Sequence, residues 1–318
     1  MQEATQSYYA HGKLLLTAEY LVLDGAKALA IPTQRGQRLI VTRKNSEDSI
    51  MQLHWQSHLN DGSTWFEARF GLQNNQLYII SSSDSKVAQT LLTLLEYARE
   101  KNVNFLSQKE HCTVHTHLEF PRHWGLGSSS TLISMIAEWA EVDPYDLVFN
   151  AFGGSGYDIA CAQAKSPIYY TLTDDVPHSE PTLFNPKFRK NLFFVHLNQK
   201  QDSKASIKHY RSLSLTKKKE WINRFSQLTS AIHYSTDLSI FEALIQKHEA
   251  YLGQILRTVP VQKRLFSTYT SGVVKSLGGW GGDFVLATGT SQDMTYFQQK
   301  GYPTIIKWDE MVLKSTYT

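Results

Sequence analysis

The chain has 318 residues, of which 42% are hydrophobic, 12% aromatic and 19% charged, and this composition excludes a disordered chain. Its 32 basic and 29 acidic residues give a formal net charge of +3, and the basic residues are spread out apart from the run LTKKKEW at 215–221. That run is typical of a solvated helix face, so we expect no nucleic-acid partner, whereas an anionic small-molecule substrate would suit the charge.

The cysteine content and the first residues bear on the compartment. Cys112 and Cys161 are the only cysteines in the sequence, too few for a disulfide framework, which favours a reducing environment. The start, MQEATQSYYAHGK, has neither the basic nor the apolar segment of a secretory signal, and no later run approaches ~20 apolar residues. We therefore expect a cytoplasmic protein with no membrane partner. The sequence does not fix the oligomeric state, for which a homodimer is the candidate.

The first part of the chain is predicted to be rich in strands. Strand formers fill 13–23 and 28–33 on either side of the turn DGAK, and apolar and polar residues alternate in QRLIVTRK and MQLHWQSH. Helical spacing follows at 86–102, and HCTVHTHLEFP returns to strand. After the segment PRHWGLGSSS, apolar residues from Thr131 to about Ala140 follow a helical stripe.

The remainder mixes helices and strands. In VDPYDLVFNAF, Asp143 is a candidate N-cap with Pro144 at the first helical position, after which GGSGYDIACA breaks the helix and PIYYTLT forms a strand. Three of the nine prolines fall in 176–190, so we place a domain boundary near 185 and predict domains 1–185 and 186–318. Beyond it we expect the strand NLFFVHL, helices over 216–257, and a strand, a helix and a strand near the end. The fold class is α+β.

The segment PRHWGLGSSS places Gly125 and Gly127 before three serines at a predicted helix start. Glycine adopts positive φ and leaves the backbone amides accessible, and a helix start favours a phosphate through its free N–H groups and dipole. A serine hydroxyl at 128, 129 or 130 could also bind Mg²⁺, which prefers oxygen ligands. A plain turn with a serine cap explains the same residues, and neither a Walker A loop nor a dinucleotide fingerprint is present.

Two further loops are rich in glycine. GGSGYDIA at 153–160 presents Asp158 after three glycines and Ser155, where the carboxylate could approach a substrate hydroxyl or cap a helix. KSLGGWGGDFVLA at 275–287 has four glycines before a strand and could be a hairpin turn. Because each loop glycine costs conformational entropy on folding, three such loops together indicate a binding site.

The three stretches, in this order, resemble the motifs of the GHMP kinases, a superfamily of small-molecule kinases. HGKLLLTAEYLVLDGAKALAIPT at 11–33 resembles the first motif, PRHWGLGSSS the second and KSLGGWGGDFVLA the third, so the resemblance spans most of the chain. It implies an N-terminal domain like domain 2 of ribosomal protein S5 and a C-terminal ferredoxin-like domain, with ATP held between them.

The resemblance also implies roles for single residues. Asp158 matches the catalytic base and Lys13 the lysine near it, while Ser129 matches the Mg²⁺ ligand. The residues that would surround the ATP phosphates are Gly125, Leu126, Gly127, Ser128, Ser129 and Ser130. The candidates for the substrate site are Glu19, Tyr20, Ser155, Gly278 and Gly279.

Details within the motifs favour phosphomevalonate over mevalonate as the substrate, with ATP and Mg²⁺ as cofactors. These details are the pair Glu-Tyr at 19–20, the pattern GSGYDIACA, and Asp283 after the second glycine pair of the third motif. A kinase for a sugar or amino-acid hydroxyl stays an alternative, as does a non-catalytic protein that binds a nucleotide or metabolite. A phosphorylated substrate needs extra cations, for which the candidates are Lys13, Arg35, Arg122, His123 and Lys275.

The sequence departs from the motifs at several positions. His11 replaces a proline, Thr17 and Ala18 replace the usual residues before the glutamate, and Leu277 and Trp280 stand where small residues are normal. We expect Trp280 to narrow the site. Mevalonate-kinase-like members have a glutamate as a second Mg²⁺ ligand, and the corresponding position in this sequence is Leu147. The adjacent Asp146 could replace that ligand, but an aspartate at this place is typical of a helix surface. Trp280 and the missing glutamate at 147 support the non-catalytic alternative.

One histidine pattern lies outside the motifs. In HCTVHTH, His111, His115 and His117 fall on one face of a predicted strand. Because no further ligand is fixed by the spacing, we interpret them as half-exposed strand surface and not as a metal site.

Overall fold

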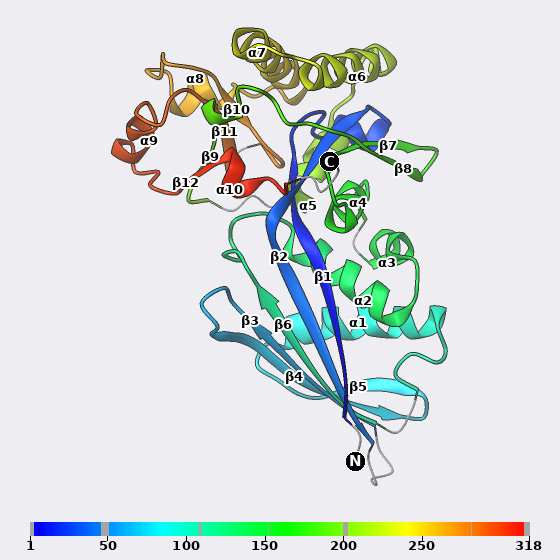
Figure 1. Cartoon of the computed structure of the whole chain (residues 1–318). Coiled ribbons are helices and arrows are strands. Elements are labelled where there is room, and N and C mark those ends of the chain that lie inside the picture. Colours follow the sequence, from blue (N-terminus) through cyan, green and yellow to red (C-terminus); the bar gives the residue numbers. More distant parts are fainter. Residues whose placement is uncertain are drawn as a thin grey trace. The chain divides into compact units, whose positions relative to one another are not determined.

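The computed structural model describes residues 3–45, 51–107, 110–151, 153–199, 203–280 and 282–314 (Figure 1). The chain forms two compact units that alternate along the sequence. The first consists of Met1–Gly12, Arg35–Arg122 and Gly127–Gln163, and the second of Lys13–Gln34, His123–Leu126 and Ala164–Thr318. The predicted boundary at 185 falls inside the second unit, and the division into domains at that residue stays a prediction.

The first unit is built on a sheet with one buried face. Its strands follow the order β5-β4-β3-β6-β2, and β3 pairs with β6 in parallel while the other neighbours are antiparallel. Burial alternates along the strands, as in β3, where Leu53, Trp55 and Ser57 point inward. The opposite face is half-exposed. The strands that contribute are β1 (Glu3–Leu15), β2 (Ala28–Asn45), β3 (Gln52–His58), β4 (Thr64–Gln73), β5 (Gln76–Ser82) and β6 (Glu110–Leu118).

Helices cover the buried face of this sheet, as Figure 1 shows for α1 and α2. They are α1 (Ser85–Lys101), α2 (Ser128–Ala140), α3 (Pro144–Ala151) and α4 (Tyr157–Gln163). Asp84 caps α1 by accepting from the N–H groups of Lys86 and Val87. Asp143 accepts from the Tyr145 N–H at 2.8 Å, which matches its predicted place before Pro144. Helix α2 packs against α1, α3 and α4, so its first turn has a fixed position within the unit.

The second unit holds two groups of strands. The first residues of β2 pair with β7 (Ile168–Thr173), which pairs with β8 (Val176–Pro181). A separate antiparallel sheet has the order β10-β11-β9-β12. Its strands are β9 (Leu192–His196), β10 (Val274–Ser276), β11 (Phe284–Thr288) and β12 (Ile305–Lys307).

Helices pack around this second sheet. Helix α7 and helix α8 contact β10, α6 packs against α7, and α10 contacts β9 and β12. The helices are α5 (Ser203–Ser212), α6 (Lys218–His233), α7 (Leu238–Leu256), α8 (Val261–Leu265), α9 (Thr295–Gln299) and α10 (Trp308–Met311), with short 3-10 turns at Leu21–Asp24 and Arg189–Asn191. The α+β class is confirmed.

Two predicted elements differ from the structure. The strand expected over 13–23 ends at Leu15, because Ala18 and Tyr20 adopt φ of 61° and 65°, which no strand accommodates. The segment 176–190, which showed almost no periodicity, contains strand β8. Its residues are mostly exposed, so no apolar alternation marks it.

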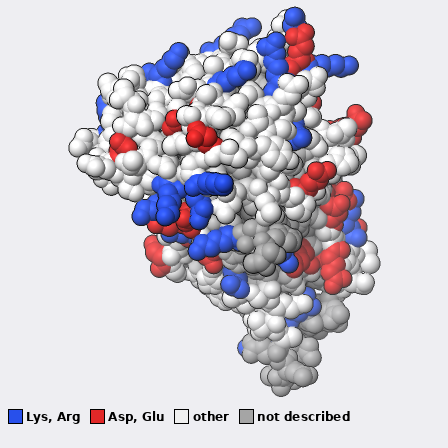
Figure 2. Space-filling view, turned by 45° about the horizontal axis from the view of Figure 1, so that its top comes forward, with Lys and Arg blue, Asp and Glu red and all other residues white. Residues whose placement is uncertain are grey.

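The surface fits the predicted charge distribution. On the face shown in Figure 2, Lys and Arg side chains form separate groups with Asp and Glu among them. Lys217, Lys218 and Lys219 are exposed at the start of α6, and Lys218 pairs with Asp24, as expected for a solvated helix face. None of the described helices is long and apolar enough to cross a membrane.

Candidate active site

Helix α2 starts with open backbone groups. Gly125 and Gly127 adopt φ of 68° and 89°, and Gly127 is the N-cap residue in the left-handed region. Gly127 has no side chain that could cap this helix. The structure therefore has the features that the glycine-serine loop predicts: glycines where positive φ is required, and a helix start whose N-cap residue has no side chain.

The three serines of this loop differ in what their hydroxyls do. Ser130 is 3% exposed, and its hydroxyl donates to the Gly127 carbonyl at 2.8 Å, so it closes the helix start. Ser128 is half-buried and Ser129 is exposed. Ser129 is thus the most exposed serine of this turn, and its role as a Mg²⁺ ligand stays a prediction.

The part of the loop before α2 is held by its neighbours within the second unit. The Lys13 N–H donates to the Leu126 carbonyl at 2.9 Å, which ties the loop to β1, and the Lys13 side chain is half-buried. A Cβ on Gly125 would lie 2.2 Å from Cγ of Asp283. Gly125 is therefore required for its φ and for the close approach of the Asp283 carboxyl group.

Asp158 lies in the first turn of α4, the short helix that packs against α2. Gly153, Gly154 and Gly156 all have positive φ, and a Cβ on Gly153 or Gly154 would meet nothing within 4 Å. The Asp158 side chain is half-buried, while Ser155 is buried. Helix α4 was not predicted, because the glycines before it read as a break in the preceding helix.

The Asp158 carboxylate acts on a neighbour in the same unit. Burial raises the pKa of Tyr145 to about 12, and the charges of Asp143 and Asp158 add to this effect. Asp158 and the serines thus lie at the starts of two helices that pack together. The structure brings these two predicted parts of the site into one unit.

The third motif contributes a buried ionic cluster in the second unit. Lys275 is 0% exposed, and its ammonium group donates to Glu19 and lies 3.8 Å from Glu249. The imidazole of His248 lies 3.3 Å from Glu19, and its Nε2 accepts from the Ala18 N–H at 2.9 Å. Sequence reasoning missed His248 and Glu249, since they lie within the regular apolar pattern of α7.

Burial controls the protonation of this cluster. It raises the pKa of Glu19 to about 7, although the charge of Lys275 opposes the change, and it raises the pKa of Glu249 for the same reason. The pKa of His248 is held well below its usual range by burial and by Lys275. Because Nε2 of His248 accepts a hydrogen bond, the neutral ring carries its proton on Nδ1.

Other residues of the first and third motifs also meet within the second unit. Tyr20 is buried, and its hydroxyl donates to the Gly279 carbonyl at 2.7 Å. The indole N–H of Trp280 donates to Glu249 at 3.0 Å, and both Trp280 and Leu277 are buried. Trp280 therefore has a buried partner inside this unit, and the narrowing of the site by Trp280 stays a prediction.

The candidate cations for a phosphorylated substrate have different environments. Lys275 is enclosed by its acidic partners, so it has no access to a ligand. The guanidinium of Arg122 lies 3.6 Å from the centre of the Trp65 ring. Arg35 and His123 are exposed.

The residues near position 147 do not supply a second Mg²⁺ ligand in the structure. Leu147 is 0% exposed within the core of the first unit. Asp146 forms a salt bridge with Lys101 at 3.1 Å, as a helix-surface aspartate does. The exposed Ser129 hydroxyl and the half-buried Asp158 carboxylate are oxygen donors of the kind that Mg²⁺ prefers, and their role as ligands stays a prediction.

A second cluster of polar groups lies on the exposed face of the first unit's sheet. His115 and His117 are half-buried there, beside His58 of β3. Burial lowers the pKa of both His115 and His117, and the neighbouring His58 adds to this effect. The predicted half-exposed placement of these two histidines is confirmed, and the third ring near them is that of His58, not of His111.

Comparisons with known proteins identify the fold. No family model and no curated protein matches the sequence. Among solved structures, the L. major mevalonate kinase in complex with R-mevalonate has a TM-score of 0.65 at 13% identity, covering 99% of this chain and 98% of that one. The Lactococcus lactis galactokinase complexed with galactose has a TM-score of 0.66 at 12% identity, covering 98% and 94%.

A third solved structure extends the same result. The Streptococcus pneumoniae phosphomevalonate kinase in complex with phosphomevalonate and AMPPNP has a TM-score of 0.65 at 12% identity, covering 96% of this chain and 100% of that one. All three are members of the GHMP superfamily. The chain therefore has the two-domain GHMP kinase fold, as the motifs predicted, with an S5-like N-terminal and a ferredoxin-like C-terminal domain.

Proposed function

We propose that the chain is an ATP-dependent small-molecule kinase that phosphorylates phosphomevalonate or, as the second choice, mevalonate. The observation that carries this proposal is the pair of helix starts in the first unit. Helix α2 begins at a glycine N-cap in the left-handed region, with Ser129 exposed, and α4 packs against it with Asp158 in its first turn. The fold shared with the mevalonate, phosphomevalonate and galactose kinases supports this.

The loop residues would bind the phosphates of ATP. The amides of Ser128, Ser129 and Ser130 offer N–H donors at the positive end of the helix dipole, and Gly125 and Gly127 leave these amides accessible. The Leu126 carbonyl, which accepts from Lys13, holds the loop against β1. Phosphoryl transfer requires mainly positioning and charge neutralisation, which a rigid loop supplies.

The residues that would carry the transfer itself are Asp158, Lys13 and Ser129. Asp158 would accept the proton of the acceptor hydroxyl or phosphate, and Lys13 would offset negative charge that develops on the transferred group. Ser129 would hold Mg²⁺, which neutralises charge on the phosphate oxygens.

The substrate would contact the remaining predicted residues, Ser155, Gly278 and Gly279. Glu19 and Tyr20 would not contact it directly but would stabilise the third loop through their contacts with Lys275 and Gly279. This assignment follows from the closed contacts of Glu19 with Lys275 and of Tyr20 with Gly279. A Cβ on Gly278 would meet nothing within 4 Å, so its backbone is open to a ligand. We further propose that the protein acts in the cytoplasm; a homodimer stays a prediction.

One observation favours the non-catalytic alternative. Position 147 is a core leucine and Asp146 is paired with Lys101, so neither supplies the second carboxylate ligand of mevalonate-kinase-like members. A protein that binds ATP but holds Mg²⁺ weakly would regulate or recruit without turnover.

Incubation with ATP and Mg²⁺ separates these functions. The acceptors would be 5-phosphomevalonate, mevalonate, galactose and homoserine, with mass spectrometry of the products. We expect a phosphorylated product from 5-phosphomevalonate at the highest kcat/KM. ATP binding without a product from any acceptor would instead support the non-catalytic function.

Two variants test the assigned residues. Asp158→Asn should lower kcat by about 10²-fold or more and leave ATP affinity nearly unchanged, because only the proton acceptor is removed. Asp175→Asn, in the exposed turn between β7 and β8, is the matched control. Ser129→Ala should raise the Mg²⁺ concentration needed for half-maximal turnover, with Ser291→Ala in an exposed turn as its control. Unchanged kcat in Asp158→Asn would remove this residue from the role of base.

A further inference from the structure

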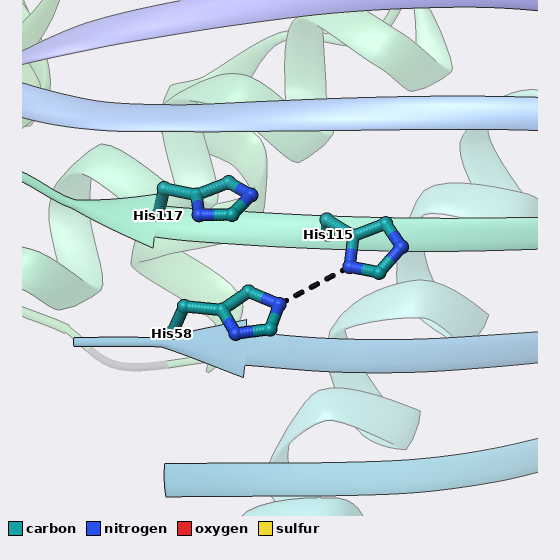
Figure 3. A group of neighbouring side chains, drawn as sticks. All are labelled: His58, His115 and His117. Atoms are coloured by element: carbon teal, nitrogen blue, oxygen red, sulfur yellow. Dashed lines mark hydrogen bonds between the residues drawn. The ribbon is translucent and has the colours of Figure 1, made fainter. Parts of the chain in front are cut away.

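Three histidines of the first unit lie together on the exposed face of its sheet, and none of them belongs to the three motifs. His58 ends β3, and His115 and His117 are two residues apart in β6. Since β3 and β6 are parallel neighbours, His58 is paired in register with His117, and Gln56 with His115. Figure 3 shows all three rings on one side of the two strands. The positions are thus fixed by backbone pairing and not by a mobile loop.

The separations of the ring nitrogens suit a shared ion. Nε2 of His58 lies 3.1 Å from Nδ1 of His115, and one nitrogen from each of the three rings lies within 4.8 Å of the others. Zinc binds histidine nitrogen at about 2.0–2.1 Å, so two ligands of a tetrahedral ion are about 3.3 Å apart. The first pair is already at that spacing, and small side-chain rotations bring His117 to it.

The other nitrogen of His58 has a partner that orients the ring. Nδ1 of His58 lies 3.1 Å from the Thr64 hydroxyl of β4. With a proton on Nδ1 donated to Thr64, Nε2 is left with a lone pair that is directed at the cluster. A hydrogen bond of this kind on the second ring nitrogen is usual for histidines that bind metals.

The neighbouring charged groups are engaged elsewhere. Arg38 of β2 is paired in register with His117, but its guanidinium lies 5.4 Å from the centre of the Tyr9 ring and donates to Ser7 at 3.3 Å. Glu67 is bonded to His54 at 2.6 Å. The Arg38 charge still acts on His117, where it adds to the lowering of the pKa.

We propose that His58, His115 and His117 form a binding site for one divalent transition-metal ion of the Zn²⁺, Ni²⁺ and Cu²⁺ class. Imidazole nitrogen suits these ions, whereas Mg²⁺ prefers oxygen, so the site is chemically distinct from the one proposed for the kinase reaction. In the metal-bound form the Nδ1 proton of His115 moves to Nε2 of the same ring, and Nδ1 binds the ion. Three protein ligands leave one position for water or an anion.

Zinc titration of the full chain, prepared without a histidine tag and treated with a chelator, tests the site. Isothermal titration calorimetry should give one Zn²⁺ per chain, and Co²⁺ should give the visible absorption of a four-coordinate ion. His115→Asn and His117→Asn should each weaken Zn²⁺ binding by about 100-fold, and Thr64→Val by about 10-fold. His178→Asn, an exposed histidine on β8, is the matched control and should bind as the unchanged chain does.

The result of the zinc titration does not depend on the result of the kinase assay. The three histidines are half-exposed, so their asparagine variants should keep the melting temperature of the unchanged chain. If His115→Asn does not fold, His117→Asn decides in its place. Absence of stoichiometric Zn²⁺ binding, or equal affinity in the cluster variants and His178→Asn, would overturn the site. Mg²⁺-dependent turnover plays no part in this decision.

Discussion

The glycine-serine loop before α2 and the glycine loop at 277–283 share a composition but differ in what meets their backbones. At the first, the N-cap residue Gly127 has no side chain, and Ser129 is exposed. At the second, Tyr20 donates to the Gly279 carbonyl and Trp280 donates to Glu249. Glycine therefore marks the backbone conformation of both loops, while their neighbours differ. The Asp283 carboxyl group approaches Gly125 of the first loop, and Tyr20 and Glu249 bond to the second.

The two loops also differ in the charged or partly charged groups beside them. The first loop offers helix N–H groups that would favour an anion from solvent. Beneath the second, Lys275 is fully enclosed and its charge is met by Glu19 and Glu249. We infer that this buried cluster holds the third loop in place, because its members come from the first motif, from α7 and from β10.

Loss of the buried cation should have the largest effect on stability. Lys275→Met leaves Glu19 and Glu249 buried without their cation, and we expect a decrease in the free energy of unfolding of about 3–5 kcal/mol. Chemical denaturation measures it. Lys307→Met, an exposed lysine of β12 in the same sheet, is the control and should change stability by less than about 0.5 kcal/mol.

Neutralising one acid tests the same cluster from the other side. Adding Glu19→Gln to Lys275→Met should recover part of the lost stability, since one uncompensated carboxylate is removed. If Lys275→Met unfolds at the same denaturant concentration as its control, the third loop does not depend on this ion pair.

The pH dependence of stability should report Glu19 directly. Burial raises the pKa of Glu19 from 4.5 to about 7, so the folded chain binds this proton more tightly than the unfolded chain. The resulting stabilisation is complete below about pH 4.5 and is lost as the pH rises through about 7, and it amounts to at most about 3 kcal/mol. The free energy of unfolding of the unchanged chain should therefore fall relative to that of Glu19→Gln between pH 4.5 and 7.

The second titrating group of the cluster acts in the opposite direction. His248 has its pKa lowered, so its contribution is present above pH 6.5 and is lost as the pH falls below that value. Glu249 has its pKa raised and acts in the same direction as Glu19. Because His248 contacts Glu19 and the charge of Glu249 acts on it, the difference between the two chains reports Glu19 together with its coupling to these neighbours. A difference that stays constant over this pH range would contradict the raised pKa of Glu19.

The sequence predicted the parts of the site that depend on short-range order. The spacing of Gly125, Gly127 and the serines before a helical stripe was enough to place the helix start, and the structure moves that start only from Thr131 to Ser128. Asp143 before Pro144 likewise specified the start of α3 through one side-chain hydrogen bond. These features are local, so neighbouring residues determine them.

The remaining features depend on pairing between distant segments. The His58 ring meets His115 because β3 and β6 are parallel neighbours, and no spacing within HCTVHTH specifies a ligand on another strand. Similarly, the ionic partner of Lys275 is 256 positions away in sequence. From the sequence, Lys275 beside a glycine loop was therefore a candidate ligand for a phosphate group. In the structure its side chain is buried.

Two glycine substitutions compare the loops at matched backbone angles. Gly125 and Gly278 have φ of 68° and 59°, but a Cβ on Gly125 would lie 2.2 Å from the Asp283 carboxyl carbon, and one on Gly278 meets nothing within 4 Å. Gly278→Ala should lower the free energy of unfolding by about 1 kcal/mol through backbone strain, and Gly125→Ala by about 2–3 kcal/mol. Denaturation of both variants measures the difference.

A second change separates strain from the clash. In an Asp283→Ala background the methyl group introduced at position 125 has no carboxyl group to meet, so Gly125→Ala should lower stability only by about 1 kcal/mol. Equal effects of Gly125→Ala in both backgrounds would show that the approach of Asp283 does not explain the glycine.

The smallest effects are expected within the serine loop itself, where Ser130 and Ser129 have opposite environments. The Ser130 hydroxyl is buried and donates to Gly127, so Ser130→Ala should lower the free energy of unfolding by about 1 kcal/mol, with little change in Mg²⁺-dependent turnover. Ser129 is exposed, so Ser129→Ala should leave stability within about 0.5 kcal/mol. Its effect should fall on turnover instead. Thermal unfolding and a turnover assay on both variants measure the two effects, and the reverse assignment would mean that Ser130, not Ser129, is the residue open to the ion.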